Sequence, residues 1–203
     1  MDKPSICVTQ KKTKDSIVLR EQWEYKKGNS AQNKKICIAL LKEQKGFCAY
    51  SEKHIAPTSS PEVEHFDDRL KYKAEDSYYN WYAVTRWMNG HKAKIEGFLP
   101  LIQPYEAYKT DRISYEEGIF VVTEVGDAEA QNLIDFLGMN KHELYVERKN
   151  HVKKIKDILE ALDGDKDMLE EHLKVYKTEL SFATALEKEL DIELESIINS
   201  LED

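Results

Sequence analysis

The chain has 203 residues, of which 41% are hydrophobic, and it holds only 8 glycines and 5 prolines. This composition is apolar enough to bury a core and excludes a disordered tail. The net charge of −8 is uneven: residues 151–203 hold 7 lysines against 15 acidic residues, and residues 1–50 hold 11 basic against 5 acidic residues. The basic N-terminal segment suits a surface that binds nucleic acid, and the acidic C-terminal segment suits a contact with another protein. Two solvent-exposed surfaces without a partner would explain the same charge asymmetry.

The sequence contains no apolar run near the roughly 20 residues that a membrane helix needs. The segment MDKPSICVTQKKTK at its start lacks the apolar stretch of a secretory signal. We therefore expect a cytoplasmic protein. The cysteines Cys7, Cys37 and Cys48 are odd in number and irregularly spaced, which does not suit a disulfide framework. We expect all of them to be free thiols.

The first predicted element is a helix over the segment AQNKKICIALLKEQK. Asn29 or Ser30 is suited to cap its start, and Gly46 follows its end. Two short segments rich in aromatic or β-branched residues, 47–50 (FCAY) and 62–66 (EVEHF), lie on either side of the loop APTSSP. This pattern predicts two strands joined by a loop.

The aromatic-rich segment 77–98 has helical or mixed spacing, and Asn89-Gly90 within it is a turn or helix-boundary signal. A β-hairpin is predicted in RISYEEGIFVVTEV, where Glu117-Gly118 lies between two β-rich runs. The segment DAEAQNLIDFLG then begins with a capping aspartate and ends at a glycine, which predicts a short helix.

The rest of the chain is predicted to be helical. A long helix begins at Asn140, and a last helical stretch or pair covers the acid-rich residues 168–203, where leucine and isoleucine recur at intervals. Such an amphipathic stretch needs a partner surface. We therefore divide the chain into residues 1–150 and a C-terminal acidic helical extension, 151–203, that contacts a partner.

Four polar residues have the chemistry of a hydrolytic site: Glu64, His65, Asn80 and Asn89. Phosphodiester hydrolysis needs a base that deprotonates water and a hard cation that neutralises charge on the phosphate. An imidazole titrates near neutral pH, so His65 suits the base. The oxygens of Glu64 and Asn89 are ligands that Mg²⁺ prefers, and Asn80 would hold the histidine loop by bonding to its backbone.

The segments LLKEQKGFCAYSEKHI, EVEHF and YYNWYAVTRWMNGHKA together resemble the HNH (ββα-metal) endonucleases. They are similar in particular to the PtuB-like subunits of Septu and retron-associated anti-phage defence systems, whose motif reads C-A-Y-C-E, I-E-H-F, Y-x-N and C-N-G-x-K. The likeness is strong from Leu40 to Lys92 and weaker up to about residue 150. It implies an α+β fold: a mostly helical HNH nuclease domain over 1–150, built around a ββα-metal motif at about 47–95, with an added β-hairpin and the acidic helical region.

The resemblance also implies a metal-dependent endonuclease that cuts DNA or RNA with Mg²⁺ or Mn²⁺. A PtuA-like ABC-type ATPase would control it within a hetero-oligomer. Carried over to this sequence, the motif assigns catalytic roles to His65 and Asn80. It assigns the role of metal ligand to Glu64 and Asn89.

Further roles follow from neighbouring positions. His91 lies two residues after Asn89 and is a rival metal ligand. The segment EHFDDRLK lacks the proline that the family more often has, so Asp67 or Asp68 could enter the shell of the metal. Lys92 stands at the basic position of the motif, and the resemblance implies that Lys92 and Arg69 contact the substrate phosphates.

The zinc-binding relatives carry two C-x-x-C pairs, and this chain keeps little of them. It has Cys48 but Ser51, and Thr85 and Met88 stand where the second pair would fall. One thiolate cannot hold a tetrahedral structural zinc, so we expect none. Packing is expected to replace the metal, with these side chains as fillers: Tyr50, Trp81, Trp87 and Met88.

Two alternatives stay open. The lost zinc ligands suit a catalytically silent HNH-like fold that is kept as an interaction subunit of the same complex. A transcriptional regulator or antitoxin would use the basic N-terminal region, but no DNA-reading helix is recognisable there. Convergence of Glu64, His65 and Asn89 on one solvent-reachable point would support the enzyme, whereas scattered or buried side chains would support the silent subunit.

Overall fold

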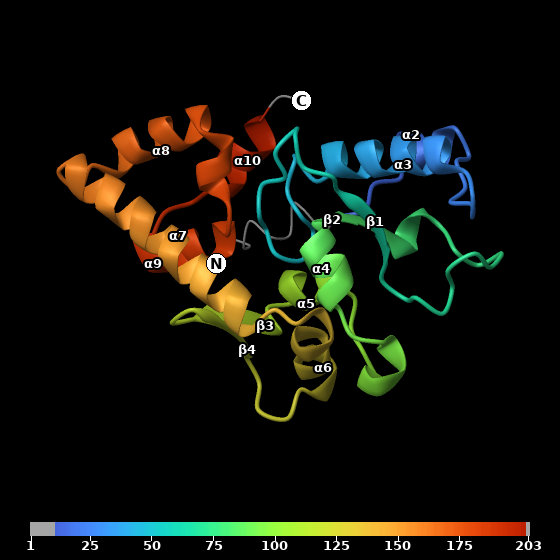
Figure 1. The fold of residues 1–203 in the computed structure, drawn as a ribbon. Helices are drawn as coiled ribbons and strands as arrows, with labels where there is room; N and C mark the ends of the chain where they lie inside the picture. The colour runs from blue at the N-terminus through green and yellow to red at the C-terminus, as the bar shows by residue number, and fades with distance from the viewer. Residues whose placement is uncertain (1–10, 202–203) are drawn as a thin grey trace.

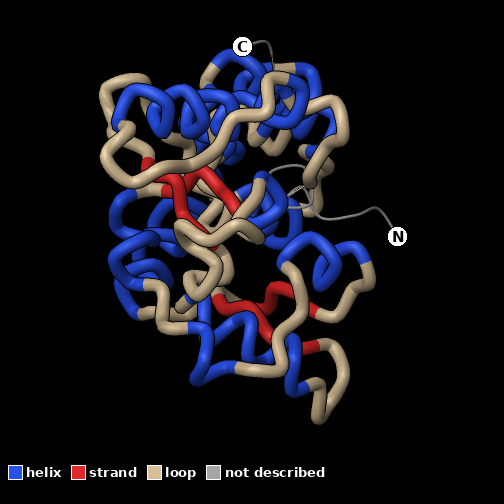
Figure 2. Tube along the Cα trace, turned by 90° about the vertical axis from the view of Figure 1, so that its right-hand side faces the viewer, coloured by secondary structure: helices blue, strands red, loops and turns tan. Residues whose placement is uncertain are grey.

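The computed structural model describes residues 11–201, in which helices predominate over two small antiparallel hairpins (Figures 1 and 2). This is the predicted α+β class. Cys7 lies outside the described residues, whereas Cys37 and Cys48 are buried free thiols, as predicted. Within residues 11–201, no helix is both long enough and apolar enough to cross a bilayer.

The first hairpin is followed directly by a short helix. Strand β1 (Glu62–His65) pairs antiparallel with β2 (Trp81–Val84), so that His65 lies opposite Trp81. A 3-10 turn, η1 (Tyr78–Asn80), leads into β2, and helix α4 (Arg86–His91) begins two residues after β2 ends. The order strand, strand, helix is the one that a ββα motif requires.

The strand predicted at 47–50 is not formed, and this prediction was wrong. Phe47 makes one isolated antiparallel bridge to His54, and the chain turns between them. Strand β1 pairs instead with β2, which belongs to the segment predicted to have helical or mixed spacing. All four residues of β2 are buried. A strand that is apolar on both faces lacks the alternation by which strands are recognised.

Helix α3 (Ser30–Glu43) covers one face of the hairpin and confirms the first predicted helix. Asn29 is its cap, because its side chain accepts a hydrogen bond from the backbone N–H of Gln32. The short helix α2 (Ile17–Arg20) packs on α3. Together they enclose a small hydrophobic cluster with the facing residues of the hairpin, which include Val63 and Trp81.

The second hairpin is the predicted one. Strands β3 (Ile113–Glu116) and β4 (Ile119–Val122) are joined by Glu117 and Gly118, which both adopt positive φ, of 47° and 107°. This geometry suits a tight hairpin turn and favours glycine. The capped helix that follows is also confirmed, with a left-handed glycine at its end. The other elements of this region are η2 (Ile95–Phe98), α5 (Pro104–Lys109) and α6 (Ala128–Leu137).

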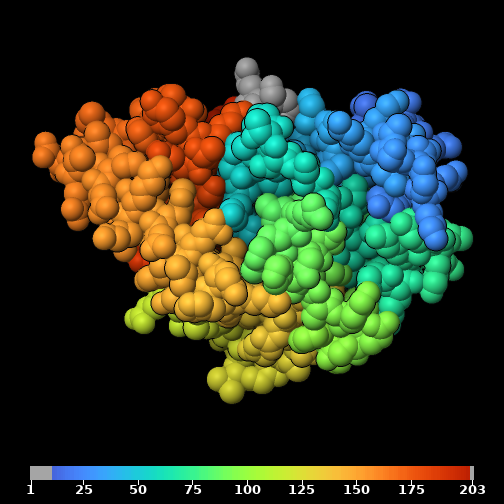
Figure 3. Space-filling model, in the orientation of Figure 1, coloured from blue at the N-terminus to red at the C-terminus, as the bar shows by residue number. Residues whose placement is uncertain are grey.

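The C-terminal part is divided more finely than predicted. The predicted long helix is α7 (His142–Ala161). The last helical stretch consists of short pieces: α8 (Lys166–Val175), η3 (Lys177–Leu180), α9 (Ala183–Leu190) and α10 (Glu195–Ser200). These helices fold back against the chain around residue 50, as the orange and cyan atoms in Figure 3 show. Leu173, Leu186 and Ile198 are fully buried in the same hydrophobic core as Phe47 and Tyr82. The apolar side of this region is thus largely covered by the chain itself.

Candidate functional site

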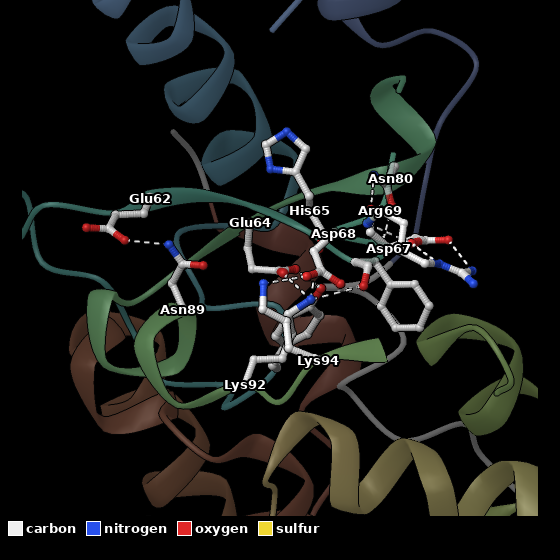
Figure 4. Close-up of polar contacts among 12 residues, drawn as sticks. Glu62, Glu64, His65, Asp67, Asp68, Arg69, Asn80, Asn89, Lys92 and Lys94 are labelled. Atoms are coloured by element: carbon white, nitrogen blue, oxygen red, sulfur yellow. Dashed lines mark hydrogen bonds and ion pairs between the residues drawn. The ribbon is translucent and has the colours of Figure 1, made fainter. Parts of the chain in front are cut away.

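Glu64 and His65 project from opposite faces of the first hairpin, because consecutive residues of a strand alternate. His65 lies with its pairing partner Trp81 on the face toward α3. Glu62 and Glu64 lie on the other face, toward α4. Figure 4 shows the His65 ring pointing away from the Glu64 carboxylate.

The His65 imidazole is buried beside a carboxylate. Its Nε2 lies 3.1 Å from Oδ2 of Asp76, and the residue is only 3% exposed. The other oxygen of Asp76 accepts hydrogen bonds from Nδ2 of Asn80 (2.9 Å) and Nε1 of Trp81 (2.7 Å). Burial alone raises the pKa of Asp76, but the polar groups around its carboxylate hold this pKa below its usual value. A negatively charged Asp76 therefore faces His65 at neutral pH.

Asn80 fixes the loop that follows His65. Its Oδ1 accepts a hydrogen bond from the backbone N–H of Asp67 at 2.7 Å, and its Nδ2 donates to the carbonyl oxygen of the same residue at 3.1 Å. The backbone carbonyl of Asn80 also accepts a hydrogen bond from the N–H of Phe66. One amide side chain thus holds both the Asp67 peptide groups and Asp76, which is the geometry expected of an asparagine that positions the histidine loop.

Glu64 is neutralised by a lysine. Nζ of Lys92 lies 2.6 Å from its carboxylate, and the two side chains are 5% and 2% exposed. The same ammonium donates to the carbonyl oxygens of His65 (2.9 Å) and Phe66 (3.0 Å). Because an ammonium has three N–H donors, these three acceptors satisfy it. The Tyr50 hydroxyl donates to the other oxygen of Glu64. Lys92, predicted to contact a phosphate, is engaged here within the protein.

The other predicted metal ligands on α4 have local partners. Asn89 donates from Nδ2 to the carboxylate of Glu62 at 2.6 Å. His91 is exposed, its ring stacks on Trp87 with 4.1 Å between centroids, and its Nδ1 lies 2.7 Å from the carbonyl oxygen of Trp87. The Asn89 side chain points toward Glu62 and not toward His65, which lies on the opposite face of the hairpin (Figure 4).

The loop after His65 carries two ion pairs. Asp67 accepts two hydrogen bonds from the Arg69 guanidinium, at 2.9 and 2.7 Å. Asp68 pairs with Nζ of Lys94 at 2.6 Å. The hydrogen bonds from Arg69 hold the pKa of Asp67 below its usual value. Arg69, predicted to contact substrate, therefore has its charge balanced by the residue two positions before it.

The predicted metal ligands do not converge in this arrangement. Glu64 is paired with Lys92, Asn89 is paired with Glu62, and His65 lies on the other face. Among residues 11–201, no group of three or more His, Cys, Asp or Glu side chains is placed to hold a metal ion. The side chains as placed do not fit the Mg²⁺ site that the resemblance implies, and we assign no step of the chemistry to a metal.

Two residues of the site were missed by the sequence analysis. Asp76 pairs with His65, and Tyr25 covers it with an edge-on ring whose centroid lies 4.6 Å from that of the imidazole. Asp76 precedes Asn80 by four residues in an irregular loop, where no periodicity marks it. Tyr25 comes from a segment 40 positions earlier, before the first helix of the predicted motif. Neither residue belongs to the motif or to a periodic pattern, so the sequence does not mark either of them as part of the site.

The four positions at which the zinc-binding HNH motif carries cysteines lie together in this chain. The backbone N–H of Thr85 contacts Sγ of Cys48 at 3.4 Å. Ser51, Thr85 and Met88 line one cavity of about 140 Å³. Cys48 and Met88 are fully buried. Met88 therefore fills this place, as predicted, and Trp87 lines the cavity.

The two other predicted fillers differ. Tyr50 is buried in the same hydrophobic core as Cys48 and Met88, with its hydroxyl directed to Glu64. Trp81 belongs to the separate cluster against α3, on the opposite face of the hairpin. The assignment of Trp81 to the zinc position was wrong, because spacing along the chain does not reveal which face of β2 a side chain occupies.

The turn between Phe47 and His54 is linked to the C-terminal helices by a buried carboxylate, that of Glu52. We expect this carboxylate to make the stability of the protein depend on pH. Glu52 is 2% exposed and accepts hydrogen bonds from the backbone N–H and hydroxyl of Thr184. Burial raises the pKa of Glu52 from 4.5 to about 7, although those bonds and the Arg148 charge oppose the rise. The stability that Glu52 contributes is therefore complete below about pH 4.5 and is lost as the pH rises through 7.

The expected loss is on the order of 3 kcal/mol. Chemical denaturation of the wild type and of Glu52→Gln between pH 4.5 and 8 measures it, because the difference between the two curves isolates Glu52. The exposed Glu75→Gln is the matched control, whose curve should run parallel to that of the wild type. Parallel curves for Glu52→Gln would contradict the raised pKa.

Comparison of the chain with protein-family models, with curated proteins and with solved structures finds no match. Membership of the HNH endonucleases thus stays a prediction from the sequence motif. The structure adds two observations to this motif: the order β1, β2, α4 of the elements that carry it, and the contacts among His65, Asp76 and Asn80.

Proposed function

We propose that this chain hydrolyses phosphodiester bonds of nucleic acid with His65 as the general base. The observation that carries the proposal is the 3.1 Å approach of Asp76 to Nε2 of His65. The approach is an ionic contact, since neither Nε2 of His65 nor Oδ2 of Asp76 makes a hydrogen bond of good geometry. The charge of Asp76 favours a proton on Nε2, which leaves the lone pair on Nδ1, and this nitrogen can accept a proton from water. A carboxylate that fixes the tautomer and orientation of an imidazole is a recurrent arrangement for a general base.

The finer proposal is an HNH endonuclease subunit of a bacterial anti-phage system. Support for it comes from the motif over residues 40–92 and from the ββα order of the elements that carry it. The net charge of −8 disfavours tight binding of nucleic acid by this chain alone. A PtuA-like ABC-type ATPase that controls access to the substrate would compensate for this charge.

The test is cleavage of plasmid DNA and of total tRNA by the purified chain, with and without the ATPase. His65→Ala is expected to lower the rate by about 100-fold or more, since a positioned general base contributes 10²–10⁴-fold. His142→Ala is the matched control, because His142 is an exposed histidine with no role in the proposed site, and this variant should cut at the wild-type rate. Parallel reactions with Mg²⁺, Mn²⁺ and EDTA show whether cutting depends on a cation. Equal cutting by His65→Ala would remove His65 from the mechanism.

A second candidate function is a catalytically silent interaction subunit. It is favoured by the criterion drawn from the sequence, because Glu64, His65 and Asn89 do not converge on one solvent-reachable point. His65 is buried beneath Tyr25, Glu64 is paired with Lys92, and Asn89 is bonded to Glu62. In the described arrangement, a water molecule must displace Tyr25 or its segment to reach the imidazole. Absence of cutting by the folded wild type together with its partner, under all the conditions above, would select this candidate.

A further inference from the structure

A hollow of about 440 Å³ lies beside the His65–Asp76 pair, where the N-terminal segment meets the loop after β1. We call it the Tyr25–Tyr72 hollow, and its lining includes these residues: Tyr25, Lys26, Lys27, Tyr72, Lys73 and Asp76. Its volume lies within the range of about 300–1,000 Å³ that is usual for ligand sites. In Figure 3, the blue N-terminal residues adjoin the blue-green loop at this edge of the molecule.

An aromatic pair forms one wall of the hollow. The rings of Tyr25 and Tyr72 stack with 5.8 Å between centroids and 26° between planes. Tyr72 is nevertheless 51% exposed, so much of its surface stays available. Nζ of Lys71 lies 5.4 Å from the Tyr72 centroid and 5.7 Å from that of Tyr25. A ring that is supported on one side and open to solvent is a stacking surface for a base.

The rest of the lining consists of three lysines, two acidic residues and one alanine: Lys26, Lys27, Lys73, Glu24, Asp76 and Ala74. Lys26 is paired with Glu24 at 2.6 Å, and Asp76 is engaged by the His65 and Asn80 side chains. Lys27 and Lys73 are exposed and have no acidic partner among residues 11–201. The two lysines therefore offer uncompensated positive charge beside the exposed ring.

We infer that the Tyr25–Tyr72 hollow binds an unpaired segment of a nucleic-acid strand. Its base stacks on Tyr72, and its phosphates contact Lys27 and Lys73. A base inside a duplex is stacked on both faces by its neighbours, so only an unpaired base can offer its plane to Tyr72. The inference deepens the proposed function, on which it rests, because it names the form of substrate that the His65 site receives.

The hollow is connected to the proposed base through two shared residues. Asp76 lines the hollow and approaches His65 at 3.1 Å, and Tyr25 lines it and covers the imidazole. A base stacked on the open side of Tyr72 leaves the Tyr25–Tyr72 stack in place. The neighbouring part of the strand then lies along the edge of the hollow that Tyr25 and Asp76 share with His65.

The test is fluorescence anisotropy of three labelled probes with the full chain: single-stranded oligothymidylate, single-stranded oligouridylate and a duplex of equal length. EDTA is present, and a gel of each probe after the measurement shows whether the probe is still intact. Both single strands are expected to bind more tightly than the duplex. Tyr72→Ala should weaken single-strand binding about tenfold, and Tyr72→Trp should retain it. The double variant Lys27→Ala/Lys73→Ala should reduce the salt dependence of log K by about 1.4, or 0.7 for each lysine.

Tyr79→Ala is the matched control, because Tyr79 is also half exposed, at 52%, and does not line the hollow. Thermal melts show that each variant is folded. Binding that is equal for duplex and single strand, or unaffected by Tyr72→Ala, would overturn the inference. If this happens while His65→Ala still abolishes cutting, the proposed function stands without the hollow. Binding that depends on Tyr72 in a chain that never cuts would support the hollow and refute the nuclease.

Discussion

Replacing Lys92 with methionine is expected to lower the free energy of unfolding by about 3–5 kcal/mol, since the change leaves a buried carboxylate without its partner. Lys92 and Glu64 are 5% and 2% exposed, and their charged groups are 2.6 Å apart. Removal of the ammonium also leaves the carbonyl oxygens of His65 and Phe66 without a donor. Methionine keeps the length and apolar character of the side chain, so the loss reports charge and hydrogen bonding more than packing.

Urea denaturation of a double-mutant cycle measures the effect. Glu64→Gln in the Lys92→Met background should recover a large part of the loss, because the remaining amide is neutral and the Tyr50 hydroxyl can still bond to it. Lys94→Met is the matched control, since its ion pair with Asp68 has the same 2.6 Å length but its side chain is 82% exposed. Its unfolding midpoint should match that of the wild type. An equally small effect of Lys92→Met would show that Glu64 is not buried as a charged group.

The same pair bears on function. A lysine that satisfies Glu64 and two carbonyl groups is an internal cation at the position where the motif implies a metal. Because both side chains are buried and paired, the Glu64 carboxylate is not open to a metal ion in this arrangement.

Local signals were sufficient for the parts of the fold that local interactions determine. Helix α6 begins at a capping aspartate and ends at the left-handed Gly138, and both residues were predicted to bound it. The β3–β4 turn requires positive φ at Glu117 and Gly118, which a Glu-Gly pair marks in the sequence. Such features depend on neighbours within a few residues, so they can be predicted without knowledge of the tertiary structure.

The other parts of the fold and of the site depend on contacts between residues far apart in the sequence. No periodic pattern in the sequence reveals such contacts. Strand β2 is buried on both faces because α3 covers one face and the large core covers the other. The site depends on contacts of the same kind: Tyr25 and Asp76 reach His65 from separate loops. The motif positions His65 and Asn80 could be recognised, but the opposite directions of Glu64 and His65 appear only with the pairing of β1 to β2.

Introducing cysteines at the three other positions of the zinc motif is expected to create a zinc site. The triple variant Ser51→Cys/Thr85→Cys/Met88→Cys, with the native Cys48, would present four thiolates, which is a complete ligand set for tetrahedral zinc. The contact of Thr85 with Cys48 and the shared cavity of about 140 Å³ place the four positions together. We expect one zinc per chain by elemental analysis, and tetrahedral thiolate absorption bands after replacement with Co²⁺.

Without metal, the triple variant should be less stable than the wild type, for two reasons. Met88 is fully buried, and its truncation leaves a cavity. Thr85 caps α4 through its hydroxyl, and cysteine is a weaker cap. Zinc at about a thousandfold excess over its Kd should then restore about 4 kcal/mol, visible as a rise in the thermal midpoint that EDTA reverses.

The matched control is the same triple variant with Cys48→Ala, which keeps three thiolates and should bind zinc far more weakly. Full zinc loading of the control, or none of the four-cysteine variant, would show that the positions do not form a tetrahedral set. Zinc loading of the four-cysteine variant alone would demonstrate that the turn at Cys48 and the start of α4 retain the arrangement of a zinc-bound ββα motif. That result would strengthen the HNH assignment independently of any cleavage assay, because it depends only on how the backbone places these four positions.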